Sequence, residues 1–221
     1  MQAEAATDGS SRAAAFPLGR TARLAVLASG RGSNLASLLA AFPPMASGGR
    51  PETGQLQLGA LELVISNKPD APALSVARAA GVEAVYVPWD KSHPRATFEA
   101  EVTRLLDLAG IDLVCLAGFM RLLSPAFTQR YAGRLLNIHP SLLPSFRGLH
   151  AQRQALAAGV SEAGCTVHFV DAGVDTGQTV VQARVPVLVG DTEATLSARI
   201  LEAEHRAYPE AVTAVLTGVR R

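Results

Sequence analysis

The hydrophobic positions of the chain form short, continuous apolar runs that alternate with segments of helical spacing. Continuous apolar runs are typical of strands that are buried on both faces. Between them, apolar residues recur three and four positions apart, as Phe98, Val102, Leu105 and Leu106 do. The pattern predicts strands at residues 23–28, 60–66, 82–87, 112–116, 134–138, 165–170 and 179–187, and helices at 34–41, 72–80, 95–109, from Ser124-Pro125 onward, 152–158 and 193–216.

This alternation predicts an α/β fold of the doubly wound type. Strand–helix–strand units form right-handed parallel crossovers, which place helices on both faces of the sheet. The last two predicted strands are joined by a glycine-rich loop, residues 172–178, which is too short for a helix. We therefore expect a mostly parallel sheet that is extended by an antiparallel pair near the C-terminus.

The ends and loops of the chain suggest one folded domain. Residues 1–20 are rich in Ala, Ser and Gly and lack a hydrophobic signal core, so we interpret them as a flexible extension. Residues 21–221 then form a single domain, with a Pro- and Gly-rich loop at 42–59.

Composition narrows the possible functions. The 221 residues are 48% hydrophobic and carry a net charge of +1, with no dense run of Lys or Arg, which argues against nucleic acid as a partner. The sequence has no apolar stretch of the ~20 residues that span a bilayer. The two cysteines are far apart, and Cys115 lies in an apolar run, so we expect buried thiols and a cytoplasmic protein.

The loop after the first strand, Ser29-Gly30-Arg31-Gly32-Ser33-Asn34, opens a helix. Its backbone N–H groups and the helix N-terminus can bind an anion, and Ser33 and Asn34 add donors. A dinucleotide motif would need a third glycine where Leu35 stands, so a single phosphate monoester is the better ligand. A tight turn with Asn34 as helix cap explains the same residues equally well.

A strand that ends in polar residues, Leu135-Leu136-Asn137-Ile138-His139-Pro140, carries the main candidate chemistry. Residues i and i+2 of a strand share a face, so Asn137 and His139 point the same way. Ligands of open α/β sheets bind at the carboxyl ends of strands, where two converging donors can hold an oxyanion. The alternative is a polar network with a structural role only.

Asp175 lies in the loop Gly173-Val174-Asp175-Thr176-Gly177, where flanking glycines would let its carboxylate reach His139 and favour the protonated imidazole. It could instead be a simple turn residue. His168 alternates with apolar neighbours and either lines the same cleft or has a structural role. The histidines and cysteines show no metal-ligand spacing, so we expect no metal.

Six segments together resemble the phosphoribosylglycinamide formyltransferase family, from about Arg23 to Gly218. They are SGRGSN (29–34), ISNKPDA (65–71), LAGFMRLLS (116–124), LLNIHPSLLPSFRG (135–148), TVHFVDAGVDTG (166–177) and EHRAYP (204–209). The resemblance implies a Rossmann-like formyltransferase domain at residues 21–221. It also implies transfer of a formyl group from 10-formyltetrahydrofolate to glycinamide ribonucleotide in purine (IMP) biosynthesis.

The same resemblance implies roles for individual residues. Asn137, His139 and Asp175 would be catalytic, and Glu204 would bind the substrate ribose. Gly32, Ser33 and Asn34 would bind its phosphate. The folate would contact Arg95, Met120, Arg121, Leu122, Leu123, Ala172, Gly173, Val174, Thr176 and Gly177.

The sequence differs from the family pattern at two places, and other functions are compatible with it. The chain has Ser145-Phe146-Arg147-Gly148 where the family often has Lys-Tyr-Pro-Gly, and Gln178 where Pro is usual. A formyltetrahydrofolate hydrolase or a methionyl-tRNA formyltransferase shares the core, but each usually carries a further domain. A non-catalytic nucleotide-phosphate sensor is a third possibility. The protein could be a monomer or a homodimer.

Overall fold

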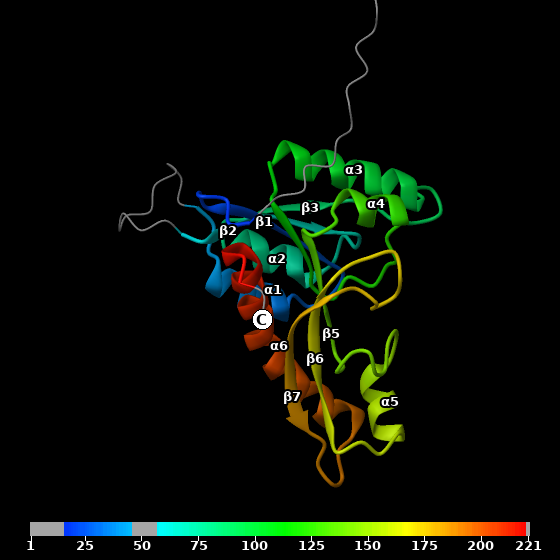
Figure 1. Cartoon of the computed structure of the whole chain (residues 1–221). Helices are drawn as coiled ribbons and strands as arrows, with labels where there is room; N and C mark the ends of the chain where they lie inside the picture. Colours follow the sequence, from blue (N-terminus) through cyan, green and yellow to red (C-terminus); the bar gives the residue numbers. More distant parts are fainter. Residues whose placement is uncertain (1–15, 46–56, 220–221) are drawn as a thin grey trace, which may run out of the picture.

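A computed structural model describes residues 16–45 and 57–219 of the chain (Figure 1). In these residues, seven strands form one sheet and six helices pack around it. The strands are β1 (Ala22–Ala28), β2 (Gly59–Ser66), β3 (Glu83–Tyr86), β4 (Leu113–Leu116), β5 (Leu135–His139), β6 (Glu162–Phe169) and β7 (Thr179–Pro186). The helices are α1 (Ser33–Ala41), α2 (Pro72–Ala79), α3 (Arg95–Leu108), α4 (Pro125–Arg130), α5 (Ala151–Ala157) and α6 (Glu193–Thr217).

The sheet has the strand order β3-β2-β1-β4-β5-β6-β7. Strands β1 to β5 pair in parallel, whereas β6 is antiparallel to both β5 and β7. The predicted α/β class is therefore confirmed, as is the antiparallel pair near the C-terminus. The pairing of β5 with β6 places Asn137 opposite His168 and His139 opposite Thr166.

Helices cover both faces of the sheet, and each face has its own apolar core (Figure 1). On one face, α1, α2 and α6 bury side chains such as Leu35 and Tyr208. On the other face, α3 and α4 bury Phe98 and Phe127. Because the central strands are covered on both sides, nearly every residue of β1 is buried, which explains its continuous apolar sequence.

The order of the strands determines where a ligand can bind. The chain first builds the sheet in one direction, from β1 through β2 to β3, and then crosses to β4 on the other side of β1. Ligands of such sheets bind where the direction reverses, outside the carboxyl ends of the strands. The loops that follow β1, β4 and β5 all leave the sheet at this edge.

Local sequence explains the starts of two helices. The side chain of Ser124 caps α4, and Thr192 caps α6 in a capping box with Thr195. The alternative of Asn34 as the cap of α1 is wrong, because the cap residue is Gly32 and Asn34 lies inside the helix. Gly32 has φ 83°, and a Cβ there would lie 2.9 Å from the Cα of Ala73, so this position requires glycine.

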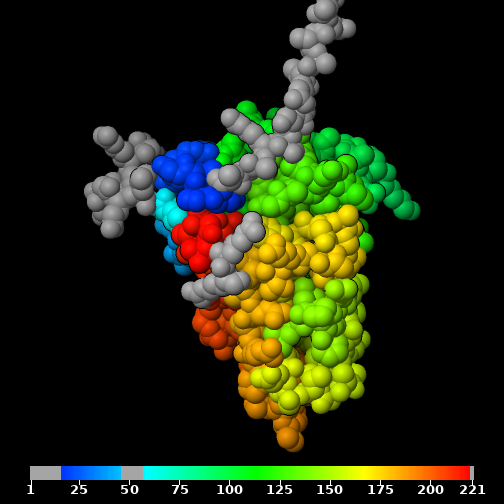
Figure 2. Space-filling model, in the orientation of Figure 1, coloured from blue at the N-terminus to red at the C-terminus, as the bar shows by residue number. Residues whose placement is uncertain are grey.

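The start of the described chain contacts the folded domain. Phe16 and Leu18 pack against the core that contains Tyr208, and Arg20 forms an ion pair with Asp112 at 2.7 Å. The two ends of the described chain lie side by side, since Phe16 and Leu216 line one hollow. In Figure 2, the red end of α6 lies close to the blue start of the described chain. Residues 1–15 of the predicted extension and residues 46–56 of the predicted loop lie outside the described residues.

Candidate active site

Asn137 and His139 lie on one face of β5 at the carboxyl end of the strand. His139 is buried, with 6% of its surface exposed. Its Nδ1 lies 3.3 Å from Oδ2 of Asp175, and its Nε2 lies 2.9 Å from the carbonyl oxygen of Phe146. The Phe146 carbonyl is an acceptor, so Nε2 of His139 donates to it, and the contact of Nδ1 with Asp175 is an ion pair when the ring is protonated.

Asp175 reaches this histidine from the loop between β6 and β7. Its backbone has φ 52°, a left-handed conformation that is uncommon for a residue other than glycine. Oδ2 accepts a hydrogen bond of 2.8 Å from the backbone N–H of Gly148. Burial raises the pKa of Asp175, but the contact with His168, the Gly148 amide and the His139 charge outweigh it and lower the pKa below its ordinary value.

His168 is nearly fully buried and contacts Asn137 and Asp175. Its Nε2 lies 3.3 Å from Nδ2 of Asn137 and 3.6 Å from Oδ1 of Asp175. Its Nδ1 lies 2.8 Å from the carbonyl oxygen of Phe169, to which it donates. His168 therefore belongs to the same polar cluster as Asn137 and Asp175.

Asn34 and Glu204 form a second polar pair, although they are 170 positions apart in the sequence. Nδ2 of Asn34 donates a 2.7 Å hydrogen bond to Oε2 of Glu204. Both side chains are buried, and Oδ1 of Asn34 is buried without a partner. Burial raises the pKa of Glu204, and the bond from Asn34 offsets only part of that rise. Ser33 and Asn34 head α1, so the first N–H groups of the helix lie beside this pair.

The residues predicted to bind folate lie on three separate segments. Met120 and Leu122 are exposed, by 70% and 67%, in the loop after β4. In the same loop, the guanidinium of Arg121 lies 5.4 Å from the ring centre of Trp89, and Leu123 packs against the core of α3 and α4. Arg95 begins α3, and the remaining predicted residues belong to the loop that carries Asp175.

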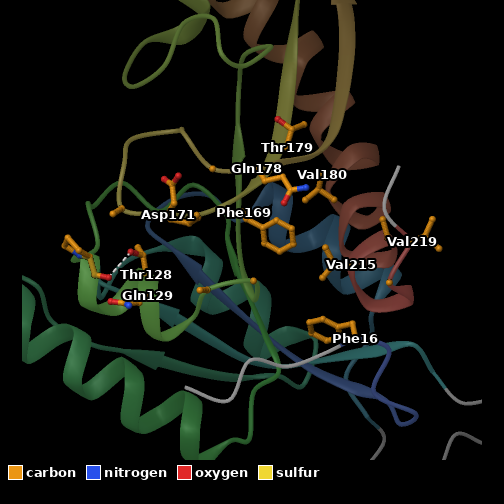
Figure 3. Close-up of a pocket in the computed structure, with 18 residues that line it drawn as sticks. Phe16, Thr128, Gln129, Phe169, Asp171, Gln178, Thr179, Val180, Val215 and Val219 are labelled. Atoms are coloured by element: carbon orange, nitrogen blue, oxygen red, sulfur yellow. Dashed lines mark hydrogen bonds between the residues drawn. The ribbon is translucent and has the colours of Figure 1, made fainter. Parts of the chain in front are cut away.

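A cavity of about 930 Å³ lies beside that loop (Figure 3). Ala172 and Gly177 of the predicted folate site line it, but Asn137, His139 and Asp175 do not. The rest of its lining comes from α4 and the turn after it, the end of β6, the start of β7, the end of α6 and Phe16. In Figure 3, Asp171 and Val219 lie on opposite sides of this space. This cavity is therefore next to the loop that carries Asp175 and is not centred on the polar cluster.

Two backbone groups in residues 146–148 contact the polar cluster, and the sequence did not predict either contact. The carbonyl of Phe146 contacts His139, and the amide of Gly148 contacts Asp175. Phe146 has φ 56°, which turns its backbone toward the cluster. No side-chain pattern reveals such contacts. The one feature of the sequence that distinguished this segment is that Ser145–Gly148 differs from the Lys-Tyr-Pro-Gly that is frequent in the family.

Two further observations bear on chemistry. Both cysteines are buried, and burial raises the pKa of the Cys115 and Cys165 thiols to about 12, so neither is a ready nucleophile. Within residues 16–45 and 57–219, no three His, Cys, Asp or Glu side chains gather as a metal site. The helices described here are all too short or too polar to cross a membrane.

Comparison with known proteins identifies relatives over nearly the whole described chain. The trifunctional purine biosynthetic protein adenosine-3 of Drosophila melanogaster is 49% identical over 199 residues, which are 90% of this chain but 14% of that protein. The phosphoribosylglycinamide formyltransferase of Escherichia coli is 44% identical over 84% of this chain and 83% of its own length.

Solved structures agree with these relatives. Glycinamide ribonucleotide transformylase 1 of Symbiobacterium toebii has a TM-score of 0.80 and 47% identity, with 90% of each chain covered. The model of the formyl transferase family matches residues 22–212. The resemblance inferred from the six sequence segments is thereby confirmed: this chain belongs to the formyl transferase family.

Proposed function

We propose that this protein transfers the formyl group of 10-formyltetrahydrofolate to the amino group of glycinamide ribonucleotide, a step of purine (IMP) biosynthesis. The contact of Asp175 with His139, at the strand end that also carries Asn137, is the observation on which the proposal depends. Relatives with the name phosphoribosylglycinamide formyltransferase, matched over most of their length, support it. The chain spans only 14–19% of the length of the trifunctional relatives, whose other activities are not part of the proposal.

The Asn34–Glu204 pair suits the ribonucleotide. Amide groups at the start of α1 would hold its phosphate, together with Gly32, Ser33 and Asn34. Glu204 would accept hydrogen bonds from the ribose hydroxyls. Both side chains are already buried and joined, so the substrate meets a prearranged surface. The folate would lie along the loop after β4 and the loop that carries Asp175, with Arg95 facing its glutamate tail.

The proposed chemistry is a direct acyl transfer. The substrate amine attacks the formyl carbon, and negative charge develops on the formyl oxygen. Asn137 has a second amide hydrogen that can donate to this oxygen, and the imidazolium of His139 stabilises the charge. Because Nε2 of His139 contacts Phe146, a direct bond from that nitrogen to the formyl oxygen requires this contact to break first.

Asp175 would move the proton. Its lowered pKa keeps the carboxylate ionised at neutral pH, so it can accept a proton from the attacking amine, directly or through a water. The same proton then passes to the nitrogen of tetrahydrofolate as the carbon–nitrogen bond to that nitrogen breaks. The products are the formylated ribonucleotide and tetrahydrofolate. The reaction as proposed needs no metal and no covalent enzyme intermediate.

We also propose a cytoplasmic protein that acts on small molecules, without nucleic acid or membrane, as a monomer or a homodimer. Two free, buried thiols suit a reducing compartment. Folate is a co-substrate in this proposal and not a resident cofactor.

The test is a transfer assay with the purified chain and 10-formyltetrahydrofolate, with and without glycinamide ribonucleotide. Mass spectrometry of the ribonucleotide detects the added formyl group. Release of formate without the ribonucleotide would indicate a hydrolase, and formylation of methionyl-tRNA would indicate the tRNA enzyme. Ribonucleotide binding without any turnover would indicate a sensor. Asp175→Asn is the matched control for background transfer.

A further inference from the structure

The loop that carries Asp175 contains a second carboxylate, Asp171, with a different set of contacts. Its Oδ1 accepts a hydrogen bond of 2.6 Å from the hydroxyl of Thr176 and one of 3.0 Å from the backbone N–H of Gly173. One oxygen therefore binds the chain on both sides of Asp175. The contacts of Asp171 are with its own loop and not with Asn137, His139 or Asp175.

This arrangement explains how Asp175 keeps an uncommon backbone conformation. A non-glycine residue with φ 52° persists only when its surroundings hold it there. A Cβ added at Gly173 would collide with the Thr176 hydroxyl, and one added at Gly177 with the carbonyl of Phe169. The loop is thus folded tightly onto itself, and the hydrogen bond between Asp171 and Thr176 closes it.

We infer that Asp171 and Thr176 are positioning residues that hold the carboxylate of Asp175 against His139 and Gly148. The inference rests on the proposed function, because formyl transfer is its main readout. The hydroxyl of Thr176 donates its hydrogen to Asp171 and thereby fixes the loop conformation. The folate contacts of Thr176 then come from its other atoms.

The inference predicts a loss in kcat and not in ribonucleotide binding. Without the bond, the loop spends only part of its time with Asp175 in place, and kcat falls by that fraction. Asp171 and Thr176 are exposed, so water competes for the bond and the loss is modest. The Asn34–Glu204 pair lies on α1 and α6, so the KM for the ribonucleotide stays the same.

The experiment compares Thr176→Val, which keeps the side-chain shape but removes the hydroxyl, with Asp171→Ala and with the double variant. We expect Thr176→Val to lower kcat about threefold to tenfold, with faster hydrogen exchange of the Gly173 amide. Since both changes remove the same bond, the double variant should be no slower than Asp171→Ala. Thr176→Ser and Asp171→Asn, which retain a hydroxyl and an acceptor oxygen, should recover most of the loss.

Thr213→Val on α6 serves as the control for a Thr-to-Val change. A kcat of Thr176→Val within twofold of the unaltered protein overturns the inference, and so do losses that multiply in the double variant. If the unaltered protein transfers no formyl group, the proposed function fails instead. In that case, hydrogen exchange of the Gly173 amide alone tests whether Asp171 and Thr176 hold the loop. An unchanged exchange rate in Thr176→Val rejects this positioning role.

Discussion

The carboxylate of Asp175 meets the imidazole of His139 at 3.3 Å, although 36 positions separate the two residues and the acid comes from a loop after the next strand. The Gly148 amide binds the same oxygen of Asp175. The contact therefore joins three segments of chain, and its two side chains can be altered separately.

Asp175→Asn should lower kcat by about 10²–10⁴, because the amide can neither accept the amine proton nor balance the charge of His139. Steady-state formyl transfer at saturating substrates measures this change. The control is Asp107→Asn, which removes an exposed ion pair with Arg130 on α3 and α4. Turnover of Asp175→Asn close to that of the unaltered protein would remove Asp175 from the mechanism.

His139→Ala should lower kcat by about 10²–10³, since the oxyanion loses the neighbouring positive charge. His93→Ala, which alters an exposed histidine on a loop, should leave kcat unchanged. Circular dichroism and the unfolding midpoint check that both variants fold. If His139→Ala keeps full activity and folds normally, charge stabilisation by the imidazolium is excluded.

The lowered pKa of Asp175 predicts how stability depends on pH. A carboxyl group whose pKa is lower in the folded state stabilises the fold above its unfolded pKa, and this stabilisation is lost as the pH falls through the folded value. The unfolding midpoint of the unaltered protein should therefore exceed that of Asp175→Asn at neutral pH, and the two should converge in acid. A constant difference at every pH would contradict the lowered pKa.

Glu204→Gln should have opposite effects on ribonucleotide binding and on the stability of the fold. Because burial raises the pKa of Glu204, its ionised form is penalised in the fold, and the penalty grows as the pH rises above the ordinary value for glutamate. Glutamine should therefore raise the unfolding midpoint at neutral pH while weakening binding of the ribonucleotide. Calorimetry of both properties tests this, with the exposed Glu202→Gln on the same helix as control. A lower midpoint at neutral pH would show that the Asn34 bond outweighs the penalty.

Asn34→Ala should weaken binding of the ribonucleotide more than binding of the folate. The side chain contacts Glu204, and its free Oδ1 is buried at the start of α1. Titration with each substrate separately gives the two dissociation constants. Ser37→Ala, one turn further along α1, is the control. Equal weakening for both substrates would argue against a phosphate-binding role for this loop.

Much of the fold could be predicted because its signals are local. Continuous apolar runs marked the buried strands, and Ser124-Pro125 marked the start of α4. The predicted start of α1 at Asn34 is one residue late, since its cap is Gly32, which has a left-handed backbone and no room for a Cβ beside Ala73. A contact between segments that are distant in sequence leaves no local pattern, so the sequence could not show it.

The candidate site was predicted only in part, because some of its features follow from local sequence and others depend on distant contacts. The i, i+2 spacing of Asn137 and His139 placed them on one face of β5, which the structure shows. Side-chain types, however, say nothing about backbone groups, so the Phe146 carbonyl and the Gly148 amide were missed. The pairing of Asn34 with Glu204 was not predicted from the residues, because it depends on how α6 crosses α1.

The antiparallel pairing of β5 with β6 also limits how this site can change. Asn137 faces His168 across the two strands because their hydrogen-bonded ladder is aligned as it is. A one-residue deletion within β6 would shift that ladder and turn His168 to the opposite face of the sheet. Length changes in the turn between α5 and β6, residues 158–161, leave the ladder intact. Insertions and deletions should therefore be tolerated there and eliminated by selection inside β6, whichever amino acids they add or remove.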